Sequence, residues 1–229
     1  MRRKSLVVLA AALVLFSLQS CKSKPEESLL RSYFHADTLN DNMTMSTMAL
    51  EPMSFGAASW KILKVSEEKI EPAKLPDLNK AELDAKKTEE AQRAQVLDAK
   101  DASDAAKDEF DSARTAGARA AAKAKMDAAQ KKFDEVYKAN SDLKVAYNEA
   151  KAAASREEEV TSFSLAAVQL ANIRDLKGEV HSKEVEVEVK AKDGSVKNYR
   201  FFLRMYDLKD EALNVAHRGS WKIIRTEQI

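Results

Sequence analysis

The sequence of 229 residues has few residues that cross-link or interrupt a chain: one cysteine, five glycines and four prolines. A single cysteine excludes a disulfide within the chain. Lysine and arginine number 38 against 37 aspartates and glutamates, so no surplus of positive charge points to nucleic acid as a partner. Glycine-rich phosphate loops, a nucleophile elbow and close metal-ligand spacings are also missing. The sequence therefore predicts no enzyme activity, no metal site and no cofactor.

The longest apolar run lies at the N-terminus and follows a basic segment. Basic residues at positions 2–4 precede an almost unbroken apolar stretch at positions 6–18. A membrane-spanning helix needs about 20 apolar residues, so this shorter run is typical of a cleaved secretory signal peptide. The stretch ends in the letters LQS, which are followed by Cys21, the one cysteine of the chain.

This leader resembles that of bacterial lipoproteins, whose lipobox has leucine three positions before a cysteine and a small residue directly before it. Leu18, Ser20 and Cys21 fit the pattern, while Gln19 is a less usual residue at its position. The resemblance implies that residues 1–20 are removed and that Cys21 carries a diacylglyceryl thioether and an N-acyl group such as palmitate. The alternative is a plain cleaved signal with an incidental cysteine.

Acylation of Cys21 would anchor the protein without a membrane-spanning helix. Each buried methylene contributes roughly 0.8 kcal/mol, and stable anchoring takes about two chains. Lys22 follows the cysteine, in place of the aspartate that marks inner-membrane retention in some bacteria. We therefore expect a cell-envelope protein that faces the periplasm, on the outer membrane rather than the inner one, with residues 21–27 as a lipidated linker.

The middle of the chain, residues 77–172, is rich in the strong helix formers alanine, lysine, glutamate and glutamine. It has no proline, and its one glycine is Gly117. A coiled-coil stripe with alternating spacings of three and four occupies its second half: Met126, Ala129, Phe133, Val136, Asn140, Leu143, Tyr147, Ala150 and Ala154. A thinner stripe occupies the first half: Leu78, Ala81, Ala85, Ala99, Ala102, Ala106, Phe110 and Ala113.

These stripes predict a long antiparallel helical hairpin, a coiled coil, with its turn at residues 115–119 around Gly117. Asn140 lies on the stripe, where a polar residue can fix the register of the two helices. A continuous rod that dimerises is the alternative. The hairpin could contact another envelope protein or act as a spacer, and the oligomeric state stays open.

The two flanking segments, residues 28–76 and 173–229, predict one split α+β domain. Helices are expected at 26–39, from Asp41 or Asn42 to residue 50, and at 163–176 with Gly178 as a cap. Strands are expected at 183–189 and 199–205, where apolar and polar residues alternate, at 60–65, which is rich in β formers, and at 221–229. A three-residue loop at 192–194 would set Val187 opposite Tyr199 and keep the apolar faces of the two strands together.

The letters YFHADTLND and the closing GSWKIIRTEQI resemble small bacterial nuclear-transport-factor-two-like (cystatin-like) domains, although the long insertion departs from that pattern. The resemblance implies a small curved antiparallel sheet with packed helices and an apolar pocket in the cone that it forms. The expected wall of that pocket is Tyr33, Phe34, Met45, Met48, Trp60 and Trp221. Asp37 and Asp41 are the acid/base groups that an enzyme of this fold could use, although Asp41 is better explained as a helix cap.

Together these features predict an α+β, membrane-anchored envelope lipoprotein that is not an enzyme and binds a protein partner or a small apolar ligand. The alternatives are a structural spacer and, less favoured, an enzyme that uses the pocket. A cluster of methionines, which could bind Cu(I), is better explained as core or pocket lining: Met43, Met45, Met48 and Met53.

Overall fold

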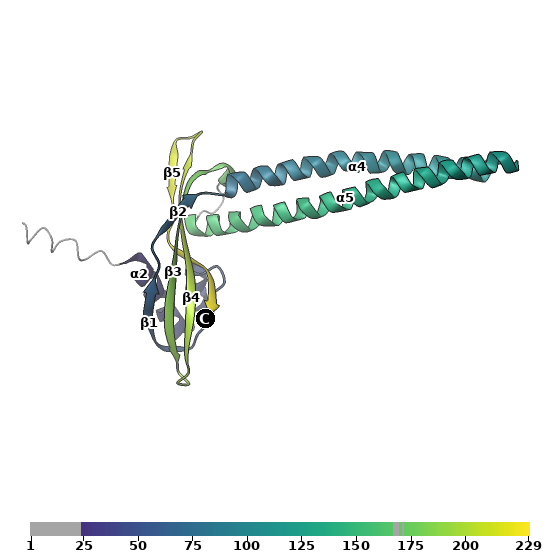
Figure 1. Cartoon of the computed structure of the whole chain (residues 1–229). Coiled ribbons are helices and arrows are strands. Elements are labelled where there is room, and N and C mark those ends of the chain that lie inside the picture. Colours follow the sequence, from purple (N-terminus) through teal and green to yellow (C-terminus); the bar gives the residue numbers. More distant parts are fainter. Residues whose placement is uncertain (1–23, 167–169, 171) are drawn as a thin grey trace, which may run out of the picture.

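The structure, a computed structural model, describes residues 24–166, 170 and 172–229. The predicted signal peptide and Cys21 lie outside these residues. The fold is α+β, as predicted: a curved antiparallel sheet of six strands carries two packed helices, and a long helical hairpin extends from one end of it (Figure 1).

Two long strands form the centre of the sheet. They are β3 (Lys177–Ala191) and β4 (Val196–Asp210), which pair antiparallel along almost their whole length. On the free side of β3 lie β1 (Ala57–Val65) and β2 (Lys69–Pro72), and on the free side of β4 lie β5 (Val215–Arg218) and β6 (Lys222–Gln228). Segments before and after the hairpin therefore complete one sheet. The segments that contain Trp60 and Trp221 lie at opposite edges of this sheet.

The loop between β3 and β4 sets the register that the sequence predicts. Val187 lies opposite Tyr199, and Val185 lies opposite Phe201. Gly194 adopts a φ of 87°, which favours glycine, and the Ala191 N–H donates to the Ser195 carbonyl at 2.9 Å. The predicted loop at 192–194 is confirmed.

Helices α2 (Pro25–Thr38) and α3 (Asn42–Met48) cover one face of this sheet. Asp41 caps α3, because its side chain accepts from the Thr44 N–H at 3.0 Å. Phe34 stacks on Trp60 of β1, with ring centroids 5.0 Å apart. Valines of β3 and Phe201 of β4 complete the core beneath the two helices.

The hairpin consists of α4 (Leu75–Ser112) and α5 (Ala116–Leu165). In α5, all nine predicted stripe residues are buried or half-buried, which confirms that stripe. In α4 the prediction is partly wrong, since Ala81 and Ala102 are exposed. The residues of α4 that face α5 include polar ones, and Glu89 and Ser103 among them are buried. The predicted stripe follows apolar residues, mainly alanines, so it could not include these two.

Both ends of α5 differ from the prediction. The turn lies at residues 113–115, because the Thr115 hydroxyl caps α5 by accepting from the Ala118 N–H at 3.3 Å, and Gly117 lies within the first turn. The predicted helix at 163–176 is also wrong. The helix α5 ends at Leu165, where Ala166 is left-handed, and a short 3₁₀ helix, η1 (Ile173–Asp175), precedes β3. Gly178 belongs to β3 and caps no helix.

Candidate functional site

The six residues predicted to line an apolar pocket lie around one core. Tyr33, Phe34 and Met45 are at most 1% exposed, so their side chains fill the interior beneath the sheet. The other three are half-buried at the edge of the same core: Met48, Trp60 and Trp221. Among the described residues these side chains border only shallow, open hollows beside α2, so binding of an apolar ligand there stays a prediction.

Asp37, one of the two conceivable acid/base groups, is fully engaged in a structural network. Its carboxylate accepts hydrogen bonds from the Ser54 hydroxyl at 2.7 Å and from the backbone N–H groups of Phe55 and Ala57 at 3.0 and 3.1 Å. This carboxylate joins the end of α2 to the start of β1. Asp41 caps α3, as described above.

The methionines and histidines do not converge on one point. Met43 is 82% exposed, whereas Met45 is buried in the core. The His181 ring pairs with Glu68 at 2.6 Å on the sheet surface. Within residues 24–166, 170 and 172–229, no group of three or more histidines, cysteines, aspartates and glutamates could hold a metal ion.

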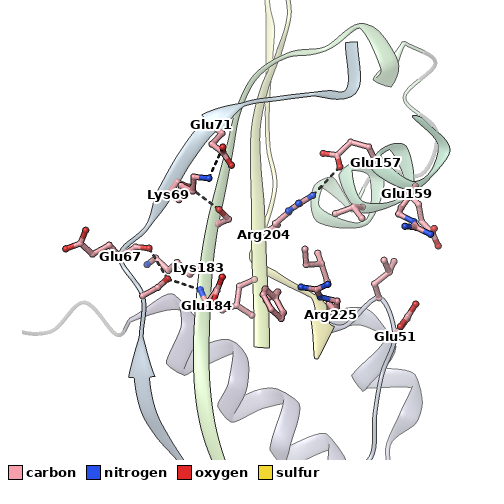
Figure 2. Close-up of a pocket in the computed structure, with 18 residues that line it drawn as sticks. Glu51, Glu67, Lys69, Glu71, Glu157, Glu159, Lys183, Glu184, Arg204 and Arg225 are labelled. Atoms are coloured by element: carbon pink, nitrogen blue, oxygen red, sulfur yellow. Dashed lines mark hydrogen bonds and ion pairs between the residues drawn. The ribbon is translucent and has the colours of Figure 1, made fainter. Parts of the chain in front are cut away.

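A large hollow lies where α5 meets the outer face of the sheet (Figure 2). This junction groove has a volume of about 850 Å³. Its floor comes from β3, β4 and β6, and its two walls come from β2 and from the last turns of α5. Most of its lining side chains are charged: Glu51, Glu67, Lys69, Glu71, Arg156, Glu157, Glu159, Lys183, Glu184, Arg204 and Arg225.

A three-residue network fastens α5 to the floor of the junction groove. Figure 2 shows Arg204 of β4 extending towards Glu157 of α5, and their side chains form an ion pair at 3.2 Å. The Tyr206 hydroxyl donates to the other oxygen of Glu157 at 2.7 Å. Burial, together with the charge of Glu157, raises the pKa of Tyr206 well above its ordinary value. The tyrosine therefore stays a hydrogen-bond donor throughout the physiological pH range.

Several cations of the junction groove already interact with a carboxylate or an aromatic ring of the same domain. Lys69 pairs with Glu71 at 2.9 Å, and the Arg225 guanidinium lies 4.0 Å from the centre of the Phe202 ring. Arg156 forms no ion pair with any described residue. The groove thus offers polar and charged contacts of both signs, which suit a polar surface rather than an apolar small molecule.

A second set of contacts fixes the base of the hairpin. Arg174 of η1 pairs with Glu82 of α4 at 2.6 Å and with Glu158 of α5 at 2.8 Å, so one guanidinium holds both helices. An apolar cluster lies at the same junction: Leu75, Val160, Ile173, Leu176, Val180, Tyr206 and Leu208. The hairpin is therefore packed on the sheet domain rather than hinged to it.

Sequence reasoning missed the junction groove and its network. The one available signal was Arg204, which alternates with Leu203 and Met205 and so had to face away from the α2 side of the sheet. Which helix covers that face depends on how the hairpin leaves the sheet, and no local pattern gives that angle.

Comparison with known proteins yields no matching family model, no similar curated protein and no similar solved structure. No helix in the described part of the chain has the length and apolar character needed to cross a bilayer.

Proposed function

We propose that this protein is a lipid-anchored envelope lipoprotein without enzymatic activity, which holds a rigid helical arm out to a protein partner. The anchor would be Cys21, which precedes the first residue of α2 by four positions. Such a short linker would keep the start of α2 close to the bilayer surface. In Figure 1 α2 begins on the side of the sheet domain that faces away from the hairpin, so an anchored molecule would direct the hairpin outwards.

The observation that carries this proposal is the length of the hairpin combined with its fixed base. At about 1.5 Å per residue, the 38 residues of α4 extend about 57 Å and the 50 residues of α5 about 75 Å. Arg174 and the apolar cluster hold the base of this arm against the sheet. A long arm with a fixed direction suits contact with a partner at a defined distance from the membrane.

A protein partner is favoured over a small apolar ligand by the packing of the sheet domain. The predicted pocket residues Tyr33, Phe34 and Met45 fill its core. The junction groove is open and lined mainly by charged side chains. Both features suit contact with a protein surface.

The anchor is tested by metabolic labelling of cells with a palmitate analogue. We expect label on the full chain and none on Cys21→Ser, which should also leave the membrane fraction. Equal labelling of both proteins would refute the anchor.

The arm is tested separately by photocrosslinking in intact cells. A photoreactive residue would replace Leu97 on the arm or, as a control of similar exposure, Leu213 in the turn after β4. We expect a discrete protein adduct from position 97 and none from position 213. If positions along the whole arm give no adduct, the hairpin is a spacer and the partner-binding function is wrong.

A further inference from the structure

One side of the hairpin carries a row of cations, here called the cationic side. The seam is the line of buried and half-buried residues along which α4 and α5 pack. Each cation of the row directly follows a seam residue in the sequence, so it borders the contact between the two helices. The row consists of Lys86, Arg93, Lys100 and Lys107 on α4, and Lys123, Lys144 and Lys151 on α5. The equivalent border on the other side of the seam has only two basic residues, Lys125 and Lys132, and half of it is alanine: Ala81, Ala102, Ala139, Ala146 and Ala153.

The antiparallel alignment sets like charges against one another on the cationic side. The Gln92 amide donates to the Val136 carbonyl, which fixes the level of the two helices. Counting outwards from this contact in opposite directions brings Lys86 to within two residues, about half a helical turn, of Lys144. The same count brings Lys107 to within two residues of Lys123.

The opposite side of the seam shows the arrangement that an isolated hairpin favours. There Glu109 of α4 and Lys125 of α5 form an ion pair at 2.6 Å between the helices. On the cationic side the described residues of α4 and α5 form no ion pair of this kind between the helices. Like charges that face each other there lower the stability of the hairpin. A charge pattern that destabilises the free hairpin points to a third element of opposite charge.

Ion pairs within each helix leave these cations accessible. Lys100 pairs with Asp104 at 2.6 Å and Lys123 with Asp127 at 3.0 Å, but these lysine and aspartate side chains are all more than half exposed. Such pairs contribute only about 0.3–0.5 kcal/mol each, so carboxylates of a partner can replace them. Lys107, Lys144 and Lys151 form no ion pair with the described part of the chain.

Exposed apolar side chains accompany the cations. Leu83 and Leu97 precede Lys86 and Lys100 by three positions, which places them on the same side of α4. Tyr137 of α5 occupies a place in the row itself, since it directly follows the seam residue Val136. Each of these three side chains is 58% exposed.

We propose that the cationic side of the hairpin docks an acidic amphipathic α-helix of the partner protein. Its apolar stripe would pack on Leu83, Leu97 and Tyr137, and its flanking glutamates or aspartates would pair with the lysines on both helices. The complex would be a coiled coil of three helices. This inference rests on the proposed function and names the chemistry of the partner.

A membrane surface or a second copy of the chain fits the cationic side less well. Acidic residues such as Glu90 and Asp104 flank the row, and α4 as a whole carries eleven acidic residues against six basic ones. A broad anionic headgroup layer would meet these carboxylates as well as the lysines, whereas a single helix can follow the narrow row. Two copies joined through this side would bring their lysines together.

The test uses the full chain in neutral detergent and a synthetic helix of three heptads as the probe. The probe has leucine at its core positions and glutamate at the flanking positions, and a matched probe has lysine in place of glutamate. Binding is followed by fluorescence anisotropy at low and high salt. One variant replaces four cations of the row with glutamine: Lys86, Lys107, Lys123 and Lys144. The control variant replaces four lysines on the outer surfaces of the same two helices: Lys80, Lys87, Lys131 and Lys138.

We expect the glutamate probe to bind the wild-type chain and the control variant in a salt-sensitive manner, and the lysine probe to bind neither. The row variant should bind the glutamate probe about tenfold more weakly, since it loses four exposed ion pairs. Equal weakening in both variants would overturn the proposal. So would concentration-dependent self-association of the full chain, or binding of the row to anionic vesicles in preference to the probe. Adducts from position 97 in cells together with failure of the probe would refute this inference and leave the proposed function intact.

Discussion

The carboxylate of Asp37, near the end of α2, accepts a hydrogen bond from the backbone N–H of Ala57, the first residue of β1, at 3.1 Å. The two residues are 20 positions apart, and the segment between them contains α3 and the chain that leads into the sheet. Asp37, a candidate for acid/base chemistry from the sequence, thus has a structural role, because it holds the end of α2 against the start of β1.

We expect Asp37→Ala to lower the free energy of unfolding by about 2–4 kcal/mol, because buried N–H groups lose their acceptor. Asp37→Asn keeps one acceptor oxygen and should cost less. Urea unfolding followed by tryptophan fluorescence measures both. A loss below about 0.5 kcal/mol in Asp37→Ala would mean that other groups or water satisfy these donors.

Gly178 of β3 pairs with Leu208 of β4. A methyl group added there would be 2.2 Å from the Asp207 carbonyl oxygen, and the backbone φ of 152° disfavours any other residue. We expect Gly178→Ala to lower the free energy of unfolding by more than about 3 kcal/mol. Gly117→Ala is the matched control, since its added methyl meets nothing and α5 gains about 0.5–1 kcal/mol. Thermal unfolding should separate the two variants in opposite directions from wild type.

Burial raises the pKa of Tyr33 to about 12. Because the folded state holds this proton more tightly than the unfolded state, whose tyrosine pKa is about 10, stability is unaffected below pH 10. Stability is then lost as the pH rises from about 10 to about 12, at up to about 1.4 kcal/mol per pH unit from this group.

The measurement for Tyr33 is the free energy of unfolding of wild type and Tyr33→Phe at several pH values across that window. The variant should be less stable at neutral pH, because it loses the hydrogen bonds to Met53. Its stability should fall less steeply above pH 10. Tyr137→Phe, at an exposed position, should keep the wild-type slope, and an unchanged slope in Tyr33→Phe would contradict the assignment.

The like charges on the cationic side make a prediction about the free hairpin. Lys144→Glu would face Lys86 across the seam, so we expect a gain of about 0.3–1 kcal/mol in hairpin stability. Lys151→Glu is the control, because the same alignment places it two residues from the neutral Asn79, the same offset as that between Lys144 and Lys86. Circular dichroism during urea unfolding at low salt measures both variants. A destabilised Lys144→Glu would show that Lys86 and Lys144 do not face each other.

The sheet was predictable where two local signals agree. The alternation of valines in β3 and aromatic residues in β4 leaves one loop length that keeps both apolar faces together, and Val187 does lie opposite Tyr199. The second helix of the hairpin was predictable for the same reason, since its stripe is strongly apolar. The strands β2 and β5 were not predicted, because each has only four residues and neither alternates clearly.

The seam of α4 and the junction groove required information that lies outside any short window. Glu89 is buried at the seam through the position of its helix against α5, although its residue type predicts exposure. Similarly, Glu157 and Arg204 are 47 positions apart and meet because the hairpin base packs on β4. Polar residues that tertiary packing buries give no apolar signal in the sequence.

The placement of the hairpin between β2 and β3 has a consequence for the kinetics of folding. Pro72 pairs with Glu179, so the sheet joins segments separated by more than a hundred residues, a distance at which loop closure is slow. Once α4 and α5 have paired through their local contacts, the two ends of the loop are already close together. The strands β2 and β3 can then pair quickly. Mutations that weaken the seam far from the sheet should therefore slow the assembly of the sheet.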